Sequence, residues 1–385
     1  MRLLFFWPAC RHESLLPFFI AFFPLFSMAQ EDSLRQAPAR NPLVIEFDLE
    51  NGGILKQKEL RDMTYKDAYY QGANLRIGWK QNSKRYAYNA LYNNPIYGVG
   101  IYSGTFNNDI IGNPFAVYGF VQVPFSPESD RRWSFDYRIA LGLTGNFKPY
   151  DKVDNPLNLA IGSRNNVFID FGLRAQYRLH AKWKAGIGVS FHHFSNGAMA
   201  LPNRGINLVP LSLSVSYQPH PEAMIRHDAP IAPFPKKWLY HINLGTGVKQ
   251  LSPDSDDSYL KATIGIYASR HVSHKWRLGA GVDFYYSGSG NDSKVAGRKA
   301  GAFGSQFSGG PTLYIVHILD ERLVLNGNIG YYLHRQEFNG EVNPFFLRAG
   351  ARYYVYKNIN AGVSIKAHMG KADFVEWTVG YTINR

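Results

Sequence analysis

Apolar and polar residues alternate along most of the chain after residue 43, which predicts β-strands with one apolar face. In the last alternating segment, 373–383, the odd positions from 375 onwards are apolar and the even positions from 376 onwards are polar or glycine. Segments of about ten residues suit tilted strands that cross a bilayer. We expect strands at 43–50, 73–80, 97–103, 116–123, 133–144, 166–178, 183–195, 206–217, 238–248, 259–270, 276–287, 304–316, 322–333, 345–356, 359–368 and 373–383.

Short and long connections alternate between these segments. Outer-membrane barrels have short periplasmic turns and longer external loops, whereas soluble β-sandwiches share only the alternation of side chains. We therefore predict an all-β protein, a transmembrane antiparallel β-barrel of 12–16 strands over residues 43–385. The proline-rich stretch 218–236 is expected to be a periplasmic connection, with a boundary between two halves as the weaker alternative.

The amino terminus predicts export from the cytoplasm. Arg2 and Arg11 precede or flank an apolar run at 15–26, and small residues end at Ala29, so residues 1–29 read as a cleaved signal peptide. Residues 30–42 form a polar lead. The single cysteine, Cys10, lies in the predicted signal peptide, which excludes disulfides, cysteine zinc sites and a cysteine nucleophile from the mature chain.

Composition agrees with a membrane barrel that contacts anionic lipid. Aromatic residues make up 15% of the chain, and a mean hydropathy of −0.26 is compatible with strands that are apolar on one face only. The net charge is +13, and removal of Arg2, Arg11 and Glu13 (+2 − 1 = +1) leaves +12. No basic helix or clustered basic stripe suggests nucleic acid, so we expect anionic lipid headgroups as partners.

The segment 183–195 carries the candidate chemistry. Its odd positions form an apolar face that ends in His193 and Ser195. In the next segment, 206–217, the odd positions form a second apolar face that begins with Asn207. A hairpin centred near Ala200 would place Asn207 across from His193. Serine becomes nucleophilic when an imidazole takes its proton, and a third group must orient that imidazole. An uncharged amide suits a site facing hydrocarbon, so this face predicts an esterase acting on lipid.

An internal repeat separates this chemistry from the barrel framework. Residues 182–191 match 275–284, but Tyr286 and Gly288 replace the histidine and serine in the second copy. The barrel therefore does not require His-x-Ser, although this pattern also occurs by chance. The backbone N–H groups of Asn196 and Gly197 are the predicted oxyanion donors.

The runs 193–197 (His-Phe-Ser-Asn-Gly) and 202–207 (Pro-Asn-Arg-Gly-Ile-Asn) resemble the lipid A 3-O-deacylase (PagL-type, acyloxyacyl hydrolase) family. The resemblance implies a Gram-negative outer-membrane barrel that cleaves an ester-linked acyl chain of lipid A in lipopolysaccharide. It makes His193 the base and Ser195 the nucleophile. That family's best-known member has glutamate where this chain has Asn207.

Asn207 is similar instead to the asparagine of outer-membrane phospholipase A, which shares His-x-Ser-Asn-Gly. That resemblance implies a phospholipid substrate, calcium and a homodimer; otherwise we expect no cofactor and no metal. Arg204, with Lys148 and Lys152, is a candidate for binding lipid A phosphates. A passive porin-like barrel is the alternative from outside the enzymes.

Other polar residues are expected in the lumen. His192 would point inward, so it cannot share a metal with His193 on a regular strand. His368 is expected to be a hydrogen-bonding group of the lumen, and Asp170 to pair with Arg174.

Overall fold

The protein consists of sixteen antiparallel strands in a computed structural model that describes residues 42–55, 69–81, 87–127, 131–221, 231–368 and 371–385. The predicted signal peptide and nearly all of the polar lead lie outside the described residues. Among the described residues, no helix is long and apolar enough to cross a membrane.

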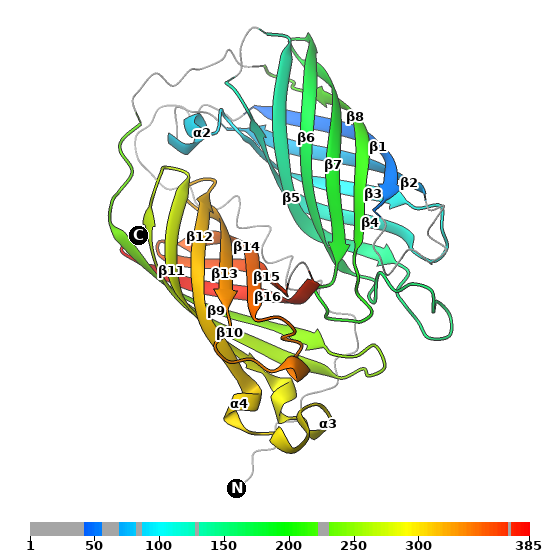
Figure 1. Ribbon diagram of the computed structural model, residues 1–385. Coiled ribbons are helices and arrows are strands. Elements are labelled where there is room, and N and C mark those ends of the chain that lie inside the picture. The colour runs from blue at the N-terminus through cyan, green and yellow to red at the C-terminus, as the bar shows by residue number, and fades with distance from the viewer. Residues whose placement is uncertain (1–41, 56–68, 82–86, 128–130, 222–230, 369–370) are drawn as a thin grey trace. The chain divides into compact units, whose positions relative to one another are not determined.

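The first eight strands form one closed barrel (Figure 1). Each strand pairs with its neighbour, and β8 pairs back with β1, for example Val215 with Phe47. The strands are β1 (Leu43–Ile54), β2 (Tyr69–Lys80), β3 (Ile96–Thr105), β4 (Gly112–Pro124), β5 (Trp133–Phe147), β6 (Asn166–His180), β7 (Trp183–Ser195) and β8 (Ile206–Tyr217). A short helix, α2 (Ala87–Leu91), lies in the β2–β3 connection.

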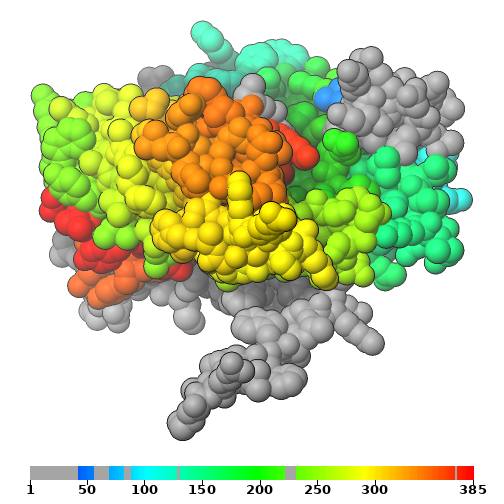
Figure 2. Space-filling view, turned by 60° about the horizontal axis from the view of Figure 1, so that its bottom comes forward, coloured from blue at the N-terminus to red at the C-terminus, as the bar shows by residue number. Residues whose placement is uncertain are grey.

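The remaining eight strands form a second closed barrel, in which β16 pairs with β9. The strands are β9 (Trp238–Gln250), β10 (Ser258–His271), β11 (Trp276–Ser287), β12 (Phe307–Ile318), β13 (Leu323–Tyr331), β14 (Phe345–Tyr356), β15 (Ile359–His368) and β16 (Lys371–Ile383). Short helical turns occupy two of its connections: η4 (Gly288–Asn291), α3 (Ser293–Ala296), η5 (Gly297–Lys299), α4 (Phe303–Gln306) and η6 (Glu337–Asn339). Figure 2 shows the β11–β12 connection, in yellow, at the surface.

The predicted all-β transmembrane architecture and strand number are confirmed, but the expectation of one barrel over 43–385 is wrong. Alternation cannot distinguish one barrel from two, because consecutive strands pair in the same way in both. Only the closing pairs, β1 with β8 and β9 with β16, decide it. The proline-rich stretch is the boundary between the barrels. Prolines such as Pro233 and Pro235 lack the N–H that a continuing strand would need.

The barrel walls are apolar outside and polar inside. On β8, Leu211 and Leu213 are 68% and 66% exposed, whereas Ser212 and Ser214 are buried in the lumen. This is the reverse of a soluble protein and matches a wall that faces hydrocarbon. The two copies of the internal repeat start β7 and β11 with Trp183 and Trp276, both on the outer surface, as interfacial girdle residues do.

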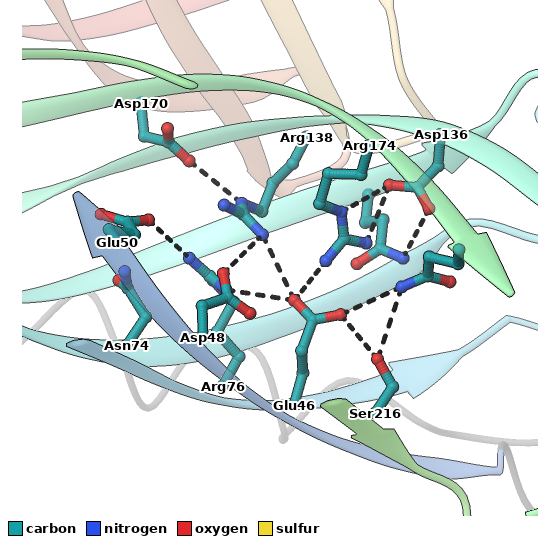
Figure 3. A network of polar contacts seen from close by, with 12 residues as sticks. Glu46, Asp48, Glu50, Asn74, Arg76, Asp136, Arg138, Asp170, Arg174 and Ser216 are labelled. Carbon is teal, nitrogen blue, oxygen red and sulfur yellow. Dashed lines mark hydrogen bonds and ion pairs between the residues drawn. The ribbon is translucent and has the colours of Figure 1, made fainter. Parts of the chain in front are cut away.

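A network of buried charges fills the lumen of the first barrel (Figure 3). Glu46 accepts hydrogen bonds from the guanidinium groups of Arg76, Arg138 and Arg174. Each of these side chains is at most 4% exposed. The network links strands that are far apart in sequence and leaves the lumen occupied by side chains.

The expected pair between Asp170 and Arg174 is wrong, although both residues are in this network. Asp170 accepts from Arg138 Nε at 3.0 Å and lies beside His192, whereas Arg174 pairs with Asp136 at 2.8 Å. Residues four apart on one strand are separated by roughly 13 Å, too far for a direct ion pair. Each charge therefore pairs across the lumen or with a neighbouring strand.

Candidate active site

The candidate site lies where β7 ends and β8 begins. The register places His193 directly opposite Asn207, as the hairpin interpretation predicted. His193 Nε2 lies 3.0 Å from Ser195 Oγ, and His193 Nδ1 lies 2.6 Å from Asn207 Oδ1. The residues between the strands, 196–205, are named the catalytic turn below.

This geometry sets the protonation of the imidazole. An amide oxygen only accepts, so the short contact with Asn207 requires a proton on Nδ1 of His193. In the neutral ring, Nε2 is then an acceptor that faces the Ser195 hydroxyl. A hydroxyl whose proton points at an oriented imidazole is the arrangement of an activated serine nucleophile.

The three side chains lie on the outer side of the barrel wall. Val189 and Phe191, which share the alternation of His193 and Ser195, are 38% and 39% exposed on the lipid-facing surface. The intervening His192 points into the lumen, where it contacts Glu50 at 2.8 Å and Asp170 at 3.1 Å. Ser195 itself is only 2% exposed, so its hydroxyl is covered.

Asn196 and Gly197, the predicted oxyanion donors, directly follow the serine. The Asn196 N–H donates to Asn203 Oδ1 at 3.3 Å, and its buried side chain donates to Ser163 Oγ at 2.8 Å and Ala200 O at 2.9 Å. Gly197 has φ +63°, a conformation that glycine adopts without strain. In this structure the Asn196 N–H is therefore paired with the Asn203 side chain.

Gly205 ends the catalytic turn against the His193 ring, a role that sequence reasoning did not assign. It has φ +76°, and a Cβ there would lie 3.0 Å from His193 Cε1 and 3.1 Å from Phe194 O. Its N–H donates to Ala160 O at 2.9 Å. Gly205 belongs to the run 202–207 that resembles the family, but the sequence does not reveal which side chain this glycine contacts.

The remaining predicted site residues lie on exposed connections or in the second barrel. Arg204 is exposed on the catalytic turn, and Lys148 and Lys152 are exposed on the β5–β6 connection. His368 is buried in the second barrel within 3.3 Å of Asp373 and 3.2 Å of Phe345 O, as expected of a hydrogen-bonding group in the lumen. In the described part of the chain, no group of three or more histidine, cysteine or acidic residues could hold a metal ion.

Solved structures similar to the chain are outer-membrane proteins of low sequence identity. Neisserial surface protein A is 9% identical with a TM-score of 0.32, covering 46% of this chain and 96% of its own. The siderophore receptor PirA from Pseudomonas aeruginosa is 9% identical with a TM-score of 0.24 and coverages of 90% and 81%. A triple mutant of the Rhodopseudomonas blastica porin is 8% identical with a TM-score of 0.17 and coverages of 89% and 99%. No curated protein matches the chain in sequence.

Two family models divide the chain as the two barrels do. The model of lipid A 3-O-deacylase (PagL) matches residues 73–216, which run from β2 to β8 and include the whole candidate site. The model of the acyloxyacyl hydrolase C-terminal domain matches residues 238–385, the second barrel. The protein is located in the outer membrane of a Gram-negative bacterium, and the chain belongs to the PagL-type family of lipid A 3-O-deacylases.

Proposed function

We propose that the protein is a serine esterase that removes an ester-linked acyl chain from lipid A, with Ser195, His193 and Asn207 as its catalytic residues. The observation that carries the proposal is the pair of contacts on one imidazole. Nε2 of His193 lies 3.0 Å from the Ser195 hydroxyl, and Nδ1 lies 2.6 Å from the Asn207 amide oxygen. Membership of the lipid A 3-O-deacylase family supports the substrate class.

In the first half of the reaction, Ser195 Oγ attacks the ester carbonyl carbon while His193 Nε2 takes the hydroxyl proton. The resulting oxyanion is stabilised by backbone N–H groups of Asn196 and Gly197. When the intermediate collapses, His193 gives the proton to the departing sugar alkoxide. The products of this half are lipid A lacking one acyl chain and an acyl ester of Ser195.

In the second half, His193 takes a proton from water, and the hydroxide attacks the acyl ester. Collapse releases the fatty acid, and the proton returns to Ser195 Oγ. Asn207 keeps Nδ1 protonated and the ring oriented throughout, so it acts without carrying a charge into an apolar setting.

The position of the site supports a membrane lipid as substrate. The strand face below His193 carries exposed Phe191, Val189 and Ile187, against which acyl chains can lie. Ser195 is only 2% exposed in this structure, so productive binding requires that the groups covering its hydroxyl move aside. An acyl chain entering from the leaflet would then reach the serine along the outer wall.

The decisive experiment compares lipid A from cells that express the wild type, Ser195→Ala or Ser190→Ala, by mass spectrometry. Ser190 lies on the same strand but faces the lumen, so Ser190→Ala controls for the loss of a serine hydroxyl from β7. We expect loss of one acyl chain with the wild type and Ser190→Ala, but not with Ser195→Ala. Intact lipid A in wild-type cells would contradict the deacylase assignment.

A second candidate, phospholipase A activity, is favoured by one observation: an amide, not a carboxylate, contacts His193 Nδ1. Purified protein incubated with phosphatidylethanolamine, with and without calcium, tests this function. Calcium-dependent release of fatty acid from the phospholipid, with no change in lipid A, would replace the deacylase proposal by the phospholipase. Measurement of the oligomeric state would test the homodimer that this function implies.

A further inference from the structure

The β5–β6 connection, residues 148–165, holds the catalytic turn at both of its ends. At the start of the turn, Asn196 Nδ2 donates to Ser163 Oγ at 2.8 Å. At the end of the turn, the Gly205 N–H donates to Ala160 O at 2.9 Å. Asn196 follows Ser195 directly, and Gly205 lies against the His193 ring. The two contacts therefore fix the backbone beside the nucleophile and beside the base.

A single side chain, Asn158, organises the part of the connection that makes these contacts. It is 0% exposed. Its Nδ2 donates to Ile110 O at 3.1 Å and Lys148 O at 2.6 Å, and its Oδ1 accepts the N–H groups of Ala160 and Ile161, both at 3.2 Å. Asn158 thus ties residues 160–161 to the base of the connection and to the β3–β4 connection. Because the acceptor for Gly205 is the carbonyl of Ala160, the position of that carbonyl depends on Asn158.

We propose that Asn158 and Ser163 are positioning residues of the esterase site, acting through the catalytic turn. Strand β7 holds Ser195 and His193 themselves, whereas the turn and the connection have little regular secondary structure. Without these hydrogen bonds, the N–H groups of Asn196 and Gly197 and the Gly205 backbone against the His193 ring would vary in position. Proton transfer and oxyanion stabilisation need their groups within hydrogen-bond reach, and a misplacement of about 1 Å can cost roughly 100-fold in rate. The inference rests on the proposed function for its kinetic readout.

Asn155 offers a matched control for Asn158. Both are buried asparagines of the same connection, and Asn155 Nδ2 donates to Ile110 O at 3.0 Å and Lys148 O at 3.3 Å. The two differ in one respect: the side chain of Asn158, and not that of Asn155, accepts the N–H groups of Ala160 and Ile161. Asn158→Ala should therefore disturb the catalytic turn more than Asn155→Ala, although both remove buried hydrogen bonds.

The test measures lipid A deacylation by the purified full-length protein. We expect Asn158→Ala to lower kcat by about 10- to 100-fold with KM changed less than about twofold, and Ser163→Ala to lower kcat by about 5- to 20-fold. Asn155→Ala should retain kcat within about threefold of the wild type, with an unfolding temperature similar to that of Asn158→Ala. Equal kcat values for Asn158→Ala and Asn155→Ala would overturn the inference.

Amide hydrogen exchange gives a second readout that does not need activity. In a Ser195→Ala background, we expect the Gly205 N–H to exchange at least about tenfold faster when Asn158 is alanine, and to be unaffected when Asn155 is alanine. Unchanged exchange in the Asn158→Ala protein would overturn the positioning role. If the wild-type protein has no esterase activity but the variants show this pattern of exchange, the proposed function is contradicted. The role of Asn158 in holding the turn is then still supported.

Discussion

His193 and Asn207 occupy directly opposite positions on β7 and β8, and their side chains meet at 2.6 Å between Nδ1 and Oδ1. In the proposed mechanism this contact joins the base to an uncharged orienting group. Asn207→Ala should lower kcat by about 100-fold or more, because it leaves the tautomer and the ring orientation of His193 unfixed. Asn207→Asp keeps an acceptor oxygen in nearly the same place and should retain activity within about tenfold of the wild type. Lipid A deacylation kinetics measure both, and full activity in Asn207→Ala would remove the residue from the mechanism.

Gly205→Ala should impair catalysis by pushing on the imidazole. A methyl group at this position would lie 3.0 Å from His193 Cε1, in a backbone conformation with φ +76°. We expect kcat to fall by about tenfold or more, and stability to fall by about 1 kcal/mol from the backbone conformation.

The control for Gly205→Ala is Gly301→Ala, which has φ +81° but nothing within 4 Å of the added Cβ. It should show the same order of backbone cost with no change in kcat. If both variants lose activity equally, contact with His193 is not the cause.

Removal of the Glu46 carboxylate should destabilise the first barrel strongly. Three buried guanidinium groups, those of Arg76, Arg138 and Arg174, contact this carboxylate and would lose a counter-charge in Glu46→Ala. Breaking a buried ion pair from one side costs about 3–5 kcal/mol. The loss of stability is measured by unfolding the protein with urea in lipid vesicles. The folded fraction is read from the gel shift that folded barrels show.

Glu337→Ala serves as the matched control. Glu337 also pairs with an arginine, Arg335, at 3.0 Å, but its side chain is 74% exposed. Surface ion pairs contribute little, so its unfolding midpoint should stay close to that of the wild type. A similar shift for both variants would argue against a special role of the lumen network.

The protein should conduct no steady ion current in planar bilayers. An eight-stranded barrel has an interior just wide enough for side chains to fill, and Arg76, Arg138, Tyr102 and Tyr118 are each no more than 2% exposed inside the first barrel. This expectation separates the enzyme from the porin-like alternative. Reproducible single-channel steps from purified protein, absent from a mock preparation, would favour the porin.

The sequence by itself determined the strands, the outward apolar faces and the pairing of His193 with Asn207. Each of these depends on local order: side chains alternate along a strand, and consecutive antiparallel strands pair with each other in a register that the apolar faces favour. The motif lay within one hairpin, so hairpin geometry alone brought Asn207 opposite His193. Family resemblance supplied the expected chemistry.

Only the tertiary structure decided where the sheet closes and what surrounds the site. Closure joins β1 to β8 and β9 to β16, pairs that are far apart in sequence and leave no mark on alternation. The contacts of Asp170 and Arg174 depend in the same way on which lumen residues face each other, so proximity along one strand predicted the wrong pair. Ser163 contacts the catalytic turn from another connection, and Asn158 acts on the turn through Ala160. These residues meet because the antiparallel neighbours β5, β6, β7 and β8 have both connections at one rim of the barrel.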